Sequence, residues 1–113
     1  MQVEVPQSRA GDTAGDTTCE NALLLRNYDD TEAAVLTVTV ADPNDEIVHT
    51  ETYTVGPLIT RTVDLPLADG VYSVSARTGL KSSTCPRCWL SDEPTEIAAV
   101  ETGNGVISVV EGV

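Results

Sequence analysis

Three cysteines carry the most concentrated chemistry in the sequence. Cys85 and Cys88 have the two-residue spacing of a knuckle that places two thiolates on one metal ion. Cys19 and His49 would complete a tetrahedral set of three sulfurs and one imidazole, which is a donor set that zinc favours. One structural zinc is therefore the only cofactor that the residues suggest, with Cys19 and His49 both far from the knuckle in the chain.

The same cysteines allow two other arrangements. A disulfide from Cys19 to Cys85 or Cys88 would bridge the ends of the domain and leave one thiol over. Cys85 and Cys88 would alternatively form a redox pair, but the low thiol pKa of such pairs depends on a helix N-terminus, and no helix is predicted there. Zinc and disulfide stay open as equal alternatives, ahead of redox chemistry.

Histidine-dependent catalysis has only one residue to use. Any Ser-His-Asp or Cys-His arrangement must include His49, and no nucleophile-elbow motif accompanies it. Neighbouring carboxylates such as Asp29-Asp30 and Asp92-Glu93 are typical of the solvated surface of a very acidic chain. No Gly-rich phosphate loop follows a predicted strand. We therefore expect no catalytic residues, and a protein that is not an enzyme.

An aromatic side chain follows the second cysteine of the knuckle. Trp89, with Arg87 and Leu90, lies in a segment bounded by polar residues. The segment is either a plug over one end of the core or an exposed anchor for a protein partner, because tryptophan is enriched at interface hot spots. Arg87, Trp89 and Leu90 are therefore candidate interaction residues.

Charge limits the partners. The sequence has 18 acidic and 6 basic side chains, a net charge of −12, and Lys81 as its only lysine. Nucleic acid needs clustered Lys or Arg to replace its counterions, so it is excluded as a partner, and an anionic membrane is disfavoured for the same reason. Because 41% of the residues are hydrophobic and patterned, the chain folds. The acidity indicates a surface adapted to molar salt, which screens self-repulsion.

Short apolar runs predict strands along the chain, and no segment has a helical period. Ala34–Ala41 alternates most clearly, with Leu36, Val38 and Val40 on one face. The other predicted strands cover residues 21–26, 46–55, 58–65, 71–78, 96–101 and 106–111, with a short additional strand at 2–5. Residues 81–95, which contain both cysteines of the knuckle, are predicted as a loop.

These spacings predict one all-β domain. About seven or eight short strands, separated by turns every eight to twelve residues or so, are typical of an antiparallel β-sandwich. Residues 1–20 are predicted to be an arm or loop, and residues 21–113 the sandwich domain. No apolar stretch is long enough to cross a membrane, and residues 1–6 lack the basic start and apolar centre of a signal peptide.

The order of several motifs resembles a known group of proteins. A Leu-Leu-Leu-Arg-Asn strand, an alternating Leu-Thr-Val-Thr-Val strand, a Tyr-Thr-Val-Gly-Pro segment and a Gly-Val-Tyr-Ser-Val strand follow one another between residues 23 and 76. This part of the chain resembles the small immunoglobulin-like β-sandwich proteins of halophilic archaea and their viruses. The resemblance implies a fold rather than an activity, since such strands occur in many unrelated sandwiches.

The first hypothesis is a non-enzymatic structural or interaction module that packs on a larger assembly. A virion decoration or minor structural protein is favoured, and a cell-surface domain comes next. We expect the protein in the virion or the cytoplasm, or at the cell surface if an upstream signal was removed, with a protein partner or further copies of itself. The alternative hypothesis is a cytoplasmic zinc-binding or thiol-active protein that uses Cys19, Cys85 and Cys88.

Overall fold

The computed structural model describes residues 18–91 and 97–111 of the 113-residue chain. The predicted strand at 2–5 and most of the predicted arm therefore lie outside the described residues. Within these ranges the chain forms eight strands and no helix. The strands are β2 (Cys19–Asn27), β3 (Ala34–Ala41), β4 (Ile47–Val55), β5 (Thr60–Leu65), β6 (Gly70–Thr78), β7 (Lys81–Leu90), β8 (Ala98–Gly103) and β9 (Val106–Glu111).

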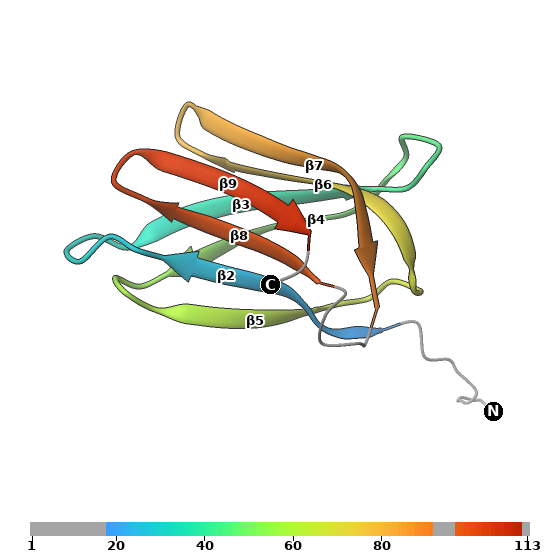
Figure 1. Ribbon diagram of the computed structural model, residues 1–113, viewed down its shortest axis with the longest axis horizontal. Helices are drawn as coiled ribbons and strands as arrows, with labels where there is room; N and C mark the ends of the chain where they lie inside the picture. The colour runs from blue at the N-terminus through green and yellow to red at the C-terminus, as the bar shows by residue number, and fades with distance from the viewer. Residues whose placement is uncertain (1–17, 92–96, 112–113) are drawn as a thin grey trace.

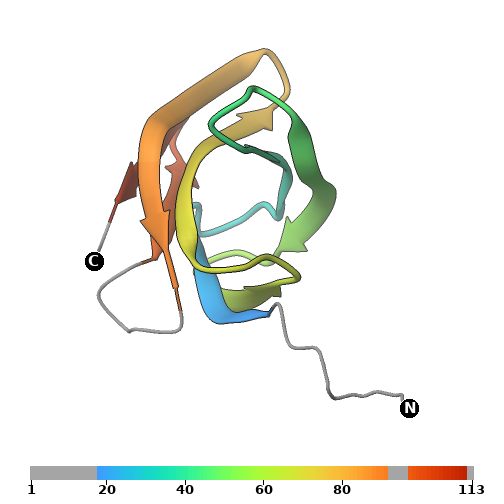
Figure 2. The same cartoon turned by 90° about the vertical axis from the view of Figure 1, so that its right-hand side faces the viewer.

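The strands form two four-stranded sheets packed face to face (Figure 1). One sheet has the order β5-β2-β8-β9, and the other has the order β4-β3-β6-β7. Figure 2 looks along the long axis of the molecule and shows β7 and β4 on opposite sides of the sandwich. Neighbouring strands pair antiparallel, except that β2 and β8 run parallel. The predicted all-β sandwich is confirmed. It differs from the prediction in one pair of strands, which is parallel rather than antiparallel.

Alternating side chains explain why the second sheet forms. In β3, the side chains of Leu36, Val38 and Val40 are fully buried, while Thr37 and Thr39 lie on the other face. Partners in an antiparallel pair share a face, so this register places Val74 and Ala76 of β6 in the same core. The strand predicted from this alternation is confirmed over the same residues.

Residues 81–90 differ most from their predicted structure. They were predicted as part of a loop, and that prediction is wrong, because they form β7 at one edge of a sheet. A register shift lets the single residue Ser73 of β6 lie opposite both Pro86 and Arg87 of β7. Proline cannot donate a ladder hydrogen bond, and a bulge in an edge strand is one of the few places where a sheet accepts it.

A buried asparagine ties the two sheets together at one end. Asn27 ends β2 and is 1% exposed, and its side-chain amide donates to the carbonyl oxygens of Glu32, Val55 and Gly56 at 2.9, 3.1 and 3.2 Å. Its side-chain oxygen accepts from the backbone N–H of Asp29 at 2.9 Å. All of these polar groups are satisfied inside the fold, so Asn27 links β2 to the end of β4.

Candidate functional site

Cys85 and Cys88 form a disulfide within β7. Both side chains lie on the core side of the strand, where Cys88 is fully buried and Cys85 packs against the core from a partly buried position. The bulge residues Pro86 and Arg87 lie between them. The disulfide therefore closes a small loop in an edge strand, away from any helix N-terminus that would activate a thiol.

Cys19 does not take part in the disulfide. Its fully buried Sγ lies 3.2 Å from the carbonyl oxygen of Leu67 and 3.5 Å from Oδ1 of Asp69, and its single S–H can donate to either acceptor. The bridge from Cys19 to Cys85 or Cys88 considered from the sequence is therefore not formed.

Burial, together with the nearby Cys19 and two acidic residues, raises the pKa of Tyr72, whose hydroxyl donates to the carbonyl oxygen of Ala68 at 2.6 Å.

The remaining candidate zinc ligand, His49, lies at the opposite edge of the sheet from Cys85. His49 pairs with Val40, Val40 pairs with Val74, and Val74 pairs with Cys85. Three strand spacings therefore separate His49 from Cys85, roughly 14 Å, which is too far for both to bind one ion. Among the described residues no group of three or more His, Cys, Asp or Glu side chains could hold a metal ion. The structure brings together two of the four predicted ligands, as a disulfide, and the zinc site stays a prediction.

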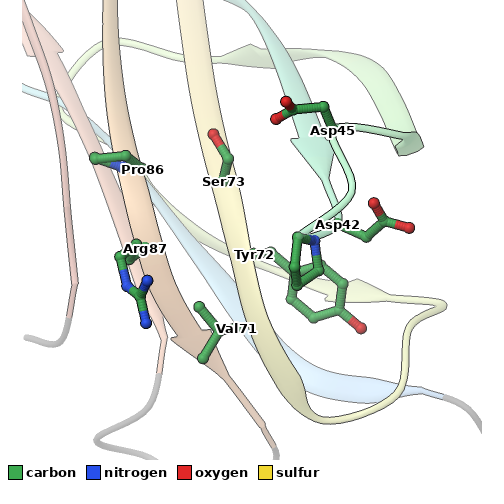
Figure 3. A pocket seen from close by; sticks show the side chains of 8 residues that line it. Asp42, Asp45, Val71, Tyr72, Ser73, Pro86 and Arg87 are labelled. Carbon is green, nitrogen blue, oxygen red and sulfur yellow. The ribbon is translucent and has the colours of Figure 1, made fainter.

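The three candidate interaction residues have different surroundings. Leu90 is fully buried in the core, so it offers no surface to a partner. Trp89 lies on the opposite side of β7 and is 39% exposed. Arg87 lies in the bulge of β7 and lines a hollow of about 230 Å³. Figure 3 shows Pro86 and Arg87 on one side of this hollow and the turn residues Asp42 and Asp45 on the other.

Rows of hydroxyl groups cover the outer side of the same sheet. We call this surface the hydroxyl face and define it by Thr37, Thr39, Thr50, Thr52, Ser75, Arg77, Ser82 and Thr84 of strands β3, β4, β6 and β7. Three cross-strand pairs share hydrogen bonds: Thr37 with Thr52 at 3.1 Å, Thr39 with Thr50 at 3.3 Å, and Ser75 with Thr84 at 2.9 Å. Most of these residues line a shallow depression of about 390 Å³.

The hydroxyl face differs in charge from the chain as a whole. Strands β3, β4, β6 and β7 contain one carboxylate, Glu51. Glu51 pairs with the core residue Val38, so its side chain leaves β4 on the side opposite the hydroxyl face. Residues 70–91 contain no Asp or Glu and three of the six basic residues, Arg77, Lys81 and Arg87. An acid-free surface is thus built into a chain of net charge −12.

The outer side of the other sheet has a mixed character. Arg26 forms an ion pair with Glu101 at 3.0 Å, and Tyr28 donates to the same carboxylate oxygen at 3.0 Å. The hydrogen bond with Tyr28, and then the charge of Glu101, raise the pKa of Arg26. Beside this cluster Leu24 and Ala99 are buried, and Val110 is exposed. This face carries charges of both signs, which the hydroxyl face does not.

The model of the halobacterial Ig-like domain matches residues 32–113, from the turn before β3 to the end of the chain. The chain belongs to the halobacterial Ig-like domain family. The predicted likeness to immunoglobulin-like proteins of halophilic archaea is therefore confirmed. A search of curated proteins and a search of solved structures found no match.

Membership of the halobacterial Ig-like family fits the structure in its fold and in its salt-adapted charge. Ig-like sandwiches generally serve as structural or interaction modules rather than as enzymes. No helix in the described part of this Ig-like domain is long and apolar enough to cross a membrane. The hydroxyl face was not among the predicted sites, although one of its signals, the acid-free segment 70–91, is visible in the sequence.

Proposed function

We propose that this Ig-like domain is a non-enzymatic module that docks on a larger protein assembly through its hydroxyl face. The observation that carries the proposal is the lack of any carboxylate on the hydroxyl face of a chain with 18 acidic residues. Elsewhere a partner would have to displace the water bound to carboxylates, which is costly when the charge is left unpaired.

Paired hydroxyls lower the cost of covering the hydroxyl face. Thr37, Thr39 and Ser75 each share a hydrogen bond with a residue on the neighbouring strand. A polar group that keeps a partner when water is removed avoids most of the desolvation penalty. The threonine methyl groups meanwhile supply apolar contact area, so a neutral and well-packed contact remains stable when molar salt screens charges.

Two larger side chains give the docking surface its anchors. Arg77 is exposed within the hydroxyl face, and Trp89 is partly exposed on the same side of β7. Arginine and tryptophan are the residue types most enriched at interface hot spots. The partner that fits is therefore a largely uncharged protein surface with one carboxylate placed to pair with Arg77 through bidentate hydrogen bonds.

The assembly that we favour is a virion of a halophilic archaeal virus, in which the domain is a decoration or minor structural protein. A cell-surface layer is the next candidate. Both are large protein assemblies, and the family and the charge of the chain indicate a high-salt setting for either. A protein or a second copy of the chain is the proposed partner in either setting, without nucleic acid or membrane insertion.

The test compares two glutamate substitutions at exposed threonines. Thr84→Glu places a carboxylate on the hydroxyl face, and Thr62→Glu places one on the outer side of β5 in the other sheet. Each variant is produced in a virus-producing culture of a halophilic archaeal host, and its high-salt extract is separated by density-gradient centrifugation. We expect the parent chain and Thr62→Glu to sediment with large particles, and Thr84→Glu to remain near the top.

Thermal melting at the same salt concentration shows whether both variants are folded. Sedimentation of folded Thr84→Glu with the particles, to the same extent as the parent, would contradict the use of the hydroxyl face. A parent chain that sediments only as a small protein would contradict docking on an assembly altogether.

The zinc or thiol hypothesis is tested separately by metal analysis and a thiol count in denaturant. We expect one thiol per chain, that of Cys19, and no zinc, because Cys85 and Cys88 are joined. One zinc with three thiols per chain would support the alternative hypothesis instead.

A further inference from the structure

The outer edge of β4 is open, whereas the edges of β7 and β9 cover each other. An edge strand presents a row of backbone N–H and C=O groups that can pair with another strand. At the seam between the sheets, Glu111 accepts from the backbone N–H of Trp89 at 2.6 Å, and Ser83 accepts from that of Val109 at 3.2 Å. The edges of β7 and β9 are thus protected by each other's side chains.

Two features limit the open part of β4. The register with β3 shifts between the pairs Val40–His49 and Ala41–Ile47, so Val48 is an extra residue at a bulge. At the other end, the guanidinium of Arg61 from β5 donates to the carbonyl oxygen of Thr54 at 3.4 Å and lies over the ring of Tyr53. Between these points Thr50, Glu51 and Thr52 are exposed and His49 is half-buried, and the hydrogen bonds of Thr50, Thr52 and His49 run through their side chains.

The side chains along this edge complement a second copy of themselves. Thr50 lies between His49 and Glu51, which share the other face of β4 because they are two residues apart. In an antiparallel pair of two β4 strands centred on Thr50, each His49 lies opposite the Glu51 of the other copy. A pair centred on Glu51 would instead place two carboxylates opposite each other, which is destabilising.

We propose that two copies of the domain join through their β4 edges, antiparallel, with Thr50 opposite Thr50 and each His49 opposite a Glu51. The pairing covers residues 48–52, from the bulge to the position before the region covered by Arg61. Nε2 of His49 already contacts the hydroxyl of Tyr53 at 3.1 Å, so the other ring nitrogen is the one that faces the second copy's Glu51.

Joining at this edge has a consequence for the hydroxyl face. The two β4-β3-β6-β7 sheets become one continuous eight-stranded sheet, because strand addition extends a sheet in its own plane. The row of Thr39 and Thr50 then continues directly into the same row of the second copy. The dimer presents two adjacent acid-free faces on one side, but its formation does not depend on the proposed docking function.

Only five residues from each copy take part, so the dimer is weak. An interface of this size lies below the roughly 1,200 Å² that stable complexes bury. We therefore expect dimers at high protein concentration, or where an assembly already holds two copies close together.

Cysteine cross-linking tests the register directly. In the proposed dimer the two Thr50 Cα atoms are about 5 Å apart, within the range of a disulfide, whereas the two Thr52 residues are roughly 13 Å apart. The variants Thr50→Cys and Thr52→Cys are matched controls, since both are exposed threonines on the same face of β4. The parent chain under the same mild oxidant controls for its own cysteines.

We expect Thr50→Cys to give disulfide-linked dimers at least about tenfold faster than Thr52→Cys at high protein concentration. Equal rates for the two variants would overturn the register. Absence of linked dimers for both variants at all concentrations would overturn the pairing itself.

Charge substitution gives a second, independent test by sedimentation at the lowest salt at which the variants remain folded. His49→Glu places a carboxylate opposite Glu51 twice in each dimer and should weaken association about tenfold. Adding Glu51→Lys to it restores opposite charges, so the double variant should regain the association of the parent. A double variant as weak as His49→Glu would contradict the proposal.

Discussion

The two outer faces of this sandwich are built on sheets of equal strand number but have different chemistry. The face over β5-β2-β8-β9 carries the ion pair of Arg26 with Glu101, the side chain of Tyr28, and a small buried apolar cluster. The hydroxyl face over β4-β3-β6-β7 has paired threonines and serines, exposed Arg77, and no carboxylate. The surface of this acidic chain is therefore not uniform, and its acid-free part is where we propose that a partner docks.

The largest expected effect comes from breaking the link between the two sheets. Asn27→Ala removes the side-chain donor of the carbonyl oxygens of Glu32 and Val55, whereas the carbonyl oxygen of Gly56 still accepts from the backbone N–H of Ile59. We expect a loss of about 4 kcal/mol in the free energy of unfolding, because buried acceptors without a partner are costly. Denaturant unfolding at constant salt measures this loss, and a change below about 1 kcal/mol would show that Asn27 does not join the sheets.

Leu90 and Trp89 are neighbours in β7 whose side chains point to opposite sides of the strand, Leu90 into the core and Trp89 outward. Leu90→Ala removes a fully buried side chain and should cost about 3 kcal/mol of stability. Trp89→Ala removes a partly exposed side chain on the other side of the strand and should cost much less, about 1 kcal/mol. Unfolding curves of both variants test this order, and the reverse order would mean that β7 faces the other way.

The hydroxyl pairs should contribute small but measurable coupling. A double-mutant cycle with Ser75→Ala and Thr84→Ala isolates the interaction across β6 and β7. We expect a coupling of about 0.5 kcal/mol that changes little with salt, because the pair is uncharged. Zero coupling would indicate that the two hydroxyls bond to water rather than to each other.

The smallest effect is expected on the other face. Glu101→Gln removes the charge that pairs with Arg26, and both side chains are partly exposed to solvent. The melting temperature should fall by less than about 3 °C at low salt, and the difference should vanish at molar salt because surface charges are screened. A difference that grows with salt would contradict this contrast with the hydroxyl face.

Local patterns in the sequence predict most of the fold. Strand β3 was placed correctly because its apolar and polar residues alternate without interruption. Strand β7 was missed because Pro86, a run of hydroxyl residues and a bulge hide its alternation. The parallel pairing of β2 with β8 has no local signal, since it depends on how distant segments meet.

The candidate site was predictable only in part. The alternation in residues 34–41 predicted which side chains share one face, but the pairing of Thr37 and Thr39 with β4 depends on a register that the sequence does not reveal. The disulfide partner of Cys88 was one of several alternatives, because connectivity cannot be deduced from spacing alone. The burial of Leu90 was not predicted, because it depends on strand β7, and residues 81–95 were predicted to form a loop.

The single tryptophan allows the most direct test of docking through the hydroxyl face. Trp89 lies on the hydroxyl-face side of β7 and is the only tryptophan in the chain, so 5-fluorotryptophan gives one ¹⁹F signal. We predict that this signal shifts and loses its solvent isotope effect when the labelled chain is added to its purified high-salt assembly. A signal that stays solvent-exposed and unshifted while the chain is bound would contradict docking through the hydroxyl face.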